Sequence, residues 1–149
     1  VGQARKTNPV AIYEFQAGWN IVPMPLDVDA GTVLRPGPGL DPDARLQVWG
    51  TTGGGTAYAK TGTLRPGSAY WAYVDPELTG RWWLVGVKPW SGEGALPSGW
   101  TFSALPESAW GETWTTQGWR AAWVWDPEGP GWRFCMGPLD PLAGMWIFR

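Results

Sequence analysis

The sequence predicts an all-β chain, in which two pseudo-repeated antiparallel units form a sandwich or barrel with little or no helix. Glycine and proline supply 22 and 15 of the 149 residues, so turns must separate many short elements. The 14 tryptophans and the 44% hydrophobic content provide enough apolar surface to build a folded core. No segment of useful length has the spacing of an amphipathic helix, and several segments recur along the chain.

Three segments of the chain recur in the same order. The matched pairs are Gly18–Pro25 with Gly99–Pro106, Leu46–Gly50 with Ala122–Asp126, and Leu64–Tyr73 with Leu139–Phe148. Matched order is typical of a duplicated unit, because each copy repeats one supersecondary pattern. We therefore predict one repeat unit at residues 18–90 and a second at 91–149, which together make one compact fold.

The strands of the first unit follow from alternation and from turn residues. Trp19, Ile21 and Met24 alternate after a glycine, and Pro25 ends that strand. The glycine-rich stretch that follows Trp49 indicates a hairpin loop. The remaining strands of this unit are expected at residues 48–49 and 57–59, which form the hairpin, and at 70–74 and 81–87.

The second unit is expected to repeat this pattern with a tighter hairpin. Strands at 123–125 and 132–134 flank a turn at Asp126–Gly131, and the last strand covers 145–148. The only helix start is at residues 41–46, where Asp41 is the N-cap and a proline follows it. That segment is long enough for one turn.

An N-terminal strand is expected within residues 1–17. Its apolar residues are Val10, Ile12, Tyr13 and Phe15. The second unit stops at Arg149 and lacks a strand equivalent to 81–87, so we hypothesise that the N-terminal strand completes the second unit and closes the fold. An alternative is that the strand is donated to a neighbouring molecule, which would produce an open filament.

Charge and residue content exclude several classes of protein. The net charge is −2 and the 11 basic residues are spread along the chain, which argues against nucleic-acid binding. Histidine is absent, so a Ser-His-Asp triad and the commonest metal ligand are absent too. No apolar run reaches the length of a membrane span. The lone cysteine, Cys135, is expected to be a small buried hydrophobic residue, and we expect no cofactor.

The tryptophans are expected to have two roles. Those at repeat-matched positions are predicted to form the shared core: Trp19, Trp49, Trp71, Trp100, Trp125 and Trp146. Those in or beside irregular segments are the ligand or interface candidates: Trp82, Trp90, Trp110, Trp114 and Trp119. Exposed aromatic rings stack on sugars and are enriched at protein interfaces, although core packing stays an alternative for this second group.

Paired carboxylates raise two weaker possibilities. Oxygen ligands for Ca²⁺ are available on four residues: Asp27, Asp29, Asp41 and Asp43. Their spacing is not that of an EF-hand, and Asp beside Pro is ordinary turn chemistry. A glycosidase would need two carboxyl groups facing each other across a cleft, which the sequence does not reveal.

The segment Gly-Trp-Asn-Ile-Val-Pro-Met-Pro at 18–25, the Val-Trp strand at 48–49 and the Pro-Gly-x-x-Tyr-Trp strand at 66–71 resemble a β-rich repeat of bacterial secreted and cell-surface proteins. The similarity covers residues 18–74 well and 99–149 more loosely. In the second unit Thr101 replaces the asparagine, and Leu142-Ala143 replaces the Pro-Gly pair. The resemblance implies a cell-surface setting and brings no catalytic residues.

Taken together, these features predict a non-enzymatic extracellular or cell-surface protein with a structural or interaction role. Such a protein would assemble with itself into a filament or surface layer, or dock to another surface protein, through exposed aromatics and strand edges. A carbohydrate-binding module with polysaccharide as its partner is the alternative, and a histidine-free carboxylate glycosidase is the third possibility. We expect a mature chain, secreted or at the cell surface after removal of a leader.

Overall fold

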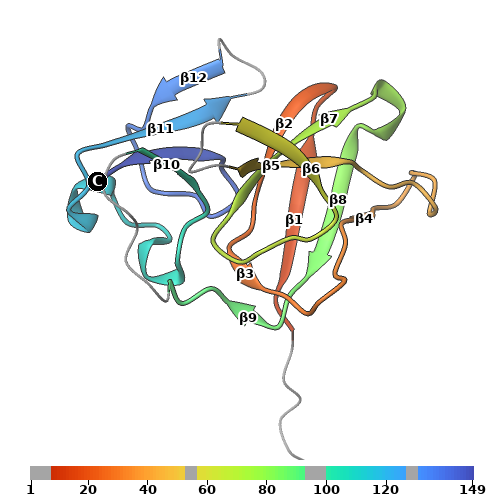
Figure 1. The fold of residues 1–149 in the computed structure, drawn as a ribbon, viewed down its shortest axis with the longest axis horizontal. Coiled ribbons are helices and arrows are strands. Elements are labelled where there is room, and N and C mark those ends of the chain that lie inside the picture. Colours follow the sequence, from red (N-terminus) through yellow and green to blue (C-terminus); the bar gives the residue numbers. More distant parts are fainter. Residues whose placement is uncertain (1–7, 53–56, 93–99, 127–130) are drawn as a thin grey trace, which may run out of the picture.

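The structure is a computed structural model that describes residues 8–52, 57–92, 100–126 and 131–149 (Figure 1). Within these residues the fold is all-β, which confirms the predicted class. The helical segments described are the 3-10 turns η2 (Pro76–Leu78), η3 (Glu107–Ala109) and η4 (Trp114–Gln117). No helix in the described part of the chain has the length and apolar character needed to cross a membrane.

The strands are short and antiparallel. In chain order they are β1 (Val10–Phe15), β2 (Gly18–Pro23), β3 (Leu26–Asp27), β4 (Arg35–Pro36), β5 (Val48–Thr52), β6 (Ala57–Thr61), β7 (Ala69–Val74), β8 (Gly80–Val85), β9 (Lys88–Pro89), β10 (Trp100–Ser103), β11 (Ala121–Asp126), β12 (Gly131–Phe134) and β13 (Met145–Phe148). Parts of the predicted hairpin loops (residues 53–56 and 127–130) and most of the connection after residue 90 lie outside the described residues.

Two sheets of the first unit share one core. One sheet has the strand order β1-β8-β4 and the other has the order β2-β7-β5-β6 (Figure 1). Side chains alternate across each strand, so Tyr13 and Phe15 of β1 and Trp82 and Leu84 of β8 point into the same cluster as Val74 of β7. The arrangement is sandwich-like, and the sheets do not close into a barrel.

The second unit repeats the strand order of the first. Its sheet runs β10-β13-β11-β12, which corresponds strand for strand to β2-β7-β5-β6. It has no second sheet among the described residues. Instead, η3, η4 and the loops around them cover one face, where Leu105, Trp119 and Leu139 pack on Val124 and Ile147.

Strand register refines the correspondence between the units. Trp49 pairs with Trp71 in the first unit, and Trp123 pairs with Trp146 in the second. Trp123 is therefore the structural equivalent of Trp49. The sequence comparison instead matches Trp49 with Trp125. The two positions differ by two residues, so both side chains lie on the same face of β11.

The N-terminal strand does not complete the second unit, so that hypothesis is wrong. β1 pairs with β8 along its whole length, from Val10 opposite Val85 to Phe15 opposite Gly80. Tyr13 and Phe15 are buried in the first core, whereas Val10 and Ile12 are exposed. The strand is therefore built into its own chain, and donation to a neighbour would first have to remove both aromatic rings from this core.

Backbone contacts join the two units. The short ribbon β3-β9 extends from the first unit to Trp90, whose carbonyl accepts the N–H of Glu107 at 2.8 Å. Beside it, the N–H of Ala104 donates to the Gly67 carbonyl at 3.0 Å. On the other side, Gly144 packs so closely on Ile21 that a side chain at residue 144 would overlap it. These contacts fix one sheet relative to the other.

Candidate functional site

The prediction that the repeat-matched tryptophans form the shared core holds only in part. Trp71, Trp125 and Trp146 are half-buried and pack against the buried cluster of Ile21, Ala69 and Phe102. Trp19 and Trp100 are 47% and 51% exposed. The other four repeat-matched tryptophans are half-buried: Trp49, Trp71, Trp125 and Trp146. The cause lies in the alternation along each strand, because smaller side chains such as Ala72 and Val74 take the core face of β7 and leave Trp71 on the opposite face.

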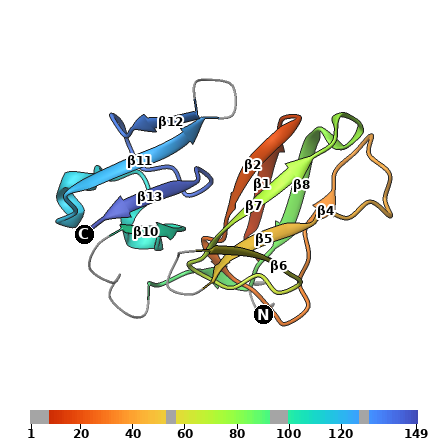
Figure 2. The same cartoon turned by 45° about the horizontal axis from the view of Figure 1, so that its top comes forward.

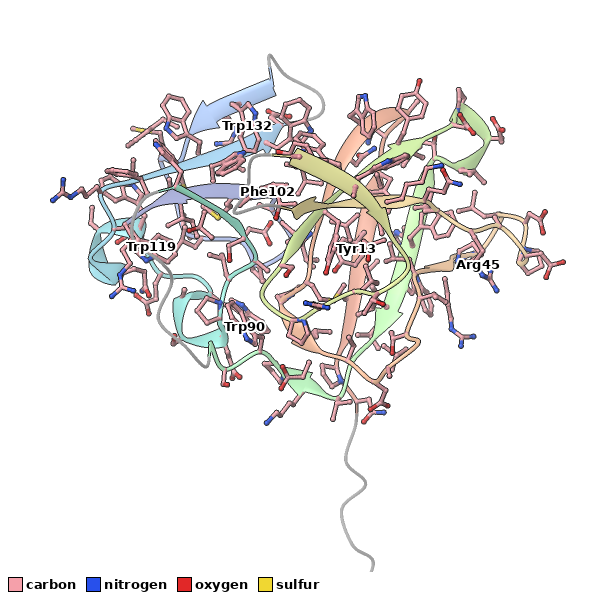
Figure 3. The ribbon with its side chains drawn as sticks, in the orientation of Figure 1. Tyr13, Arg45, Trp90, Phe102, Trp119 and Trp132 are labelled. Atoms are coloured by element: carbon pink, nitrogen blue, oxygen red, sulfur yellow. The ribbon has the colours of Figure 1, made fainter. Side chains whose placement is uncertain are left out.

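The proposed ligand candidates are largely interior residues, so they do not form an exposed platform. Trp82 is fully buried in the first core, and Trp119 is 8% exposed in the second. Figure 3 shows Trp119 on the side of the second unit that faces away from the first. The remaining candidates are half-buried: Trp90, Trp110 and Trp114.

Indole hydrogen bonds explain why these rings are held inside. The indole N–H of Trp82 donates to the carbonyl of Leu78 at 2.9 Å. Trp110 donates in the same way to Leu105 at 3.0 Å, and Trp114 donates to Cys135 at 3.2 Å. Burying an indole requires a partner for its N–H, and the irregular segments supply backbone carbonyls for this purpose.

The two four-stranded sheets lie side by side (Figure 2). Residues of both sheets line a groove. We call it the aromatic groove. Its volume is about 490 Å³, and its lining residues are Ala17, Trp19, Trp49, Tyr58, Trp71 and Trp125. The groove is therefore lined almost entirely by aromatic rings from β2, β5, β6, β7 and β11.

The rings of the groove meet edge to face. Trp19 lies 5.5 Å from Trp49 at 68° and 6.2 Å from Trp71 at 88°. Trp71 in turn lies 5.0 Å from Trp125 at 81° and 6.5 Å from Tyr58 at 87°. This edge-to-face arrangement is favoured by the quadrupoles of the rings.

A stack of rings supports the groove from beneath. Phe102 lies 5.8 Å from Trp71 and 5.3 Å from Trp146, with interplanar angles of 26° and 25°. Figure 3 shows Phe102 between the two units. Because Phe102 belongs to β10 and Trp71 to β7, this stack connects the two sheets and sets the width of the groove.

Three lining tryptophans have an indole N–H without a hydrogen-bond partner in the described part of the chain. The N–H of Trp125 donates to the Trp19 carbonyl at 3.4 Å, but those of Trp19, Trp49 and Trp71 bond to no group in the described part of the chain. The one fully buried polar side-chain atom without a partner among the described residues is Thr101 Oγ1. The free donors of the half-buried Trp49 and Trp71 are therefore open to solvent.

Charge is confined to the rim of the groove. None of the described residues that line the groove is charged. The Lys60 ammonium lies 5.9 Å from the centre of the Trp49 ring, a cation–π contact, and forms no ion pair with another described residue. Among the described residues, the groove thus presents aromatic rings, with the Lys60 ammonium over Trp49.

The carboxylates weighed as calcium ligands do not gather into a site. Asp27 pairs with Lys88 at 3.7 Å, and Asp41 accepts the backbone N–H of Asp43 at 2.9 Å. Asp29 is exposed after β3. Among the described residues no three Asp, Glu, His or Cys side chains lie close enough to hold a metal ion.

Cys135 is buried, as predicted from the sequence. Its thiol lies 3.6 Å from the carbonyl of Gly137, to which it donates, and it packs in the second core with Leu139. The residue therefore behaves as a small hydrophobic side chain with a weak donor.

Comparison of the chain with protein-family models, with curated proteins and with solved structures finds no significant match. The geometry of the aromatic groove is therefore the basis for the functional proposal.

Proposed function

We propose that the protein is a non-enzymatic binding protein, secreted or at the cell surface, that docks a partner in the aromatic groove. The observation that carries the proposal is the exposure of repeat-matched tryptophans on the outer faces of the sheets. Smaller residues occupy the core face of the same strands, as in β7. Large apolar rings exposed together are costly in an isolated protein and are typical of interaction sites. Tryptophan and tyrosine are also the residues that most often dominate binding energy.

The chemistry of the lining supports binding over catalysis. Indole and phenol groups bind apolar faces and donate hydrogen bonds, whereas acid–base catalysis on a glycan requires a pair of facing carboxyl groups. The described lining residues include no carboxylate. The third possibility raised by the sequence, a glycosidase, therefore has less support than a binding role.

Self-assembly remains a related form of this proposal. β6 ends its sheet, and its described residues Ala57–Lys60 are exposed. An open strand edge beside an apolar groove favours contact with another polypeptide. Sedimentation velocity over a range of protein concentrations separates the two forms, because self-assembly raises the mean mass with concentration and docking of a different partner does not.

The proposal is tested by ¹⁹F NMR of the protein labelled with 5-fluorotryptophan, titrated with small apolar fragments such as p-cresol and N-acetylproline amide. We expect the resonances of Trp19 and Trp49 to shift saturably. Trp100 is the matched control, because it is equally exposed and contacts Phe148, yet it lies outside the groove. Fragments that shift no groove resonance, or that shift Trp100 equally, would contradict the proposal.

A further inference from the structure

We propose that a second cavity, on the opposite side of β7 from the aromatic groove, binds a small molecule through an oxyanion, either a carboxylate or a phosphate. We call it the polar cavity. The inference goes beyond the proposed function, because the polar cavity shares no described lining residue with the groove. Three features carry it: a buried hydroxyl whose proton has no described acceptor, unpaired donors beside that hydroxyl, and a positive local charge.

The polar cavity lies where β5, β6 and β7 meet residues 62–68, which connect β6 to β7. Its volume is about 370 Å³, within the usual range of small-molecule sites. Gly50, Ala59 and Ala69 leave room for it, and every other described lining residue carries a hydroxyl or a positive charge. Tyr70 points into this side of the sheet and its neighbour Trp71 into the groove, so one strand separates the two sites.

Tyr70 places a hydrogen-bond donor in the wall of the polar cavity. The residue is 4% exposed, and its hydroxyl accepts the backbone N–H of Arg65 at 2.7 Å. Because both residues line the cavity, this hydrogen bond fixes the hydroxyl at its wall. The hydroxyl proton has no acceptor among the described residues. A buried donor is costly to leave unpaired, so an acceptor bound in the cavity would be stabilised by Tyr70.

Other donors in the lining are also unpaired. The hydroxyls of Thr63 and Ser68 and the guanidinium of Arg65 form no hydrogen bond or ion pair with a described group. A turn keeps two of these residues together, because the N–H of Ser68 donates to the Arg65 carbonyl at 3.2 Å. A guanidinium only donates, and it forms its strongest hydrogen bonds with carboxylate and phosphate oxygens. An oxyanion supplies the acceptors that these groups lack.

The charge of this region favours the same ligand. Residues 44–74 contain no aspartate or glutamate, and their basic residues are Arg45, Lys60 and Arg65, although the whole chain has a net charge of −2. All the described residues that line the polar cavity belong to this stretch. The Lys60 ammonium lies 5.9 Å from the centre of the Trp49 ring, which lines the groove, so we assign the binding charge to Arg65. Positive charge without a competing carboxylate attracts an anion.

The experiment titrates the folded protein with sodium acetate and, separately, with inorganic phosphate, at an ionic strength held constant with sodium chloride. Backbone amide shifts in ¹H–¹⁵N NMR spectra locate the contact. We expect saturable shifts of the amides of Arg65, which bonds to Tyr70, and of Ser68. Whichever anion binds more tightly identifies the group as a carboxylate or a phosphate. The indole resonances of Trp19 and Trp49 should not move, so this test is independent of binding in the groove.

A pair of arginine variants tests the charge. Arg65→Gln should weaken anion binding about tenfold or more, because it removes a charge-assisted hydrogen bond. Arg45→Gln is the matched control, because Arg45 is exposed in the same acid-free stretch but does not line the cavity. Its guanidinium donates instead to the carbonyls of Pro42 and Ala44. This control should change the affinity less than about twofold.

Two further variants test the hydroxyl donors. Tyr70→Phe keeps the ring that packs against Gly50 and should weaken binding about threefold or more. Because this change also removes the acceptor of the Arg65 N–H, Ser68→Ala provides a second test, and a loss of about threefold is expected there too. Circular dichroism confirms that each variant is folded.

Three results would overturn the inference. The first is that neither anion shifts the amides of Arg65 and Ser68 saturably. The second is that glycerol, a neutral polyol, shifts them at the same concentrations as the anions, which would show that charge plays no part. The third is that Arg65→Gln binds both anions as tightly as the wild type. None of these results bears on the aromatic groove, whose own titration decides the proposed function.

Discussion

Single residues decide which face of a strand is core and which is surface. In β7, Tyr70, Ala72 and Val74 point into the first core, while Trp71 and Tyr73 point outward. Both faces are apolar, so the sequence shows a strand but not which of its two residue sets is buried. The prediction placed Trp71 in the core because repeat-matched positions usually build a shared core, whereas it packs from the outer face against the buried cluster that contains Phe102.

Gly144 is a position where no side chain fits. It packs on Ile21 at the junction of the units, and an added methyl group would overlap that side chain. We expect Gly144→Ala to lower the free energy of unfolding by about 1–3 kcal/mol, the usual cost of overpacking. Gly137→Ala is the matched control, because nothing lies within 4 Å of a side chain placed there. Urea denaturation measures both, and equal stability of the two variants would contradict the packing at the junction.

Tyr13 makes the free energy of unfolding depend on pH in the alkaline range. Its hydroxyl donates to the Pro23 carbonyl at 2.6 Å, and burial raises its pKa above the ordinary value. Because the folded state holds this proton more tightly than the unfolded state, the stabilisation is complete below about pH 10 and is lost as pH rises through the folded pKa. We expect the unfolding free energy to fall in that range.

Substitution isolates the effect of this hydroxyl. Tyr13→Phe leaves the Pro23 carbonyl without its donor and should cost about 1–2 kcal/mol at neutral pH. The variant should also lose stability less steeply above about pH 10 than the wild type. Tyr73→Phe, at an exposed position of β7, should change neither quantity. An unchanged alkaline slope in Tyr13→Phe would show that another group is responsible.

The positions of the strands were predicted better than the pairing between them. The strand at 10–15 lies where the sequence placed it, because period-two alternation is a local property. Its pairing with β8 was not predicted, because the repeat comparison left a gap in the second unit that seemed to need this strand. The structure fills that gap with η3, η4 and their loops, whose tryptophans have no counterpart in the first unit.

The two faces of β1 should respond differently to truncation of their side chains. Phe15 is buried between the sheets, so Phe15→Ala should lower the unfolding free energy by about 3–5 kcal/mol. Ile12 is exposed on the opposite face, and Ile12→Ala should cost less than about 1 kcal/mol. Thermal or urea unfolding provides the comparison, and similar losses at both positions would mean that β1 does not pack as described.

At the scale of the whole molecule, duplication explains the groove. Each unit presents an aromatic outer face, and the Trp71–Phe102–Trp146 stack joins these faces at their base. The sequence revealed the duplication but not the way the copies meet, because contacts such as Gly144 on Ile21 join residues far apart in the chain. The site arises at the junction, and neither unit alone contains all of its lining residues.

The central claim is that Trp19 lies open at the aromatic groove while Trp82 and Trp119 are buried in the two cores. Hydroxyl-radical oxidation of the native protein, followed by mass spectrometry of each tryptophan, tests it directly. We predict rapid oxidation of Trp19 and slow oxidation of Trp82 and Trp119. Oxidation of Trp82 as fast as that of Trp19 in the free protein would contradict the account.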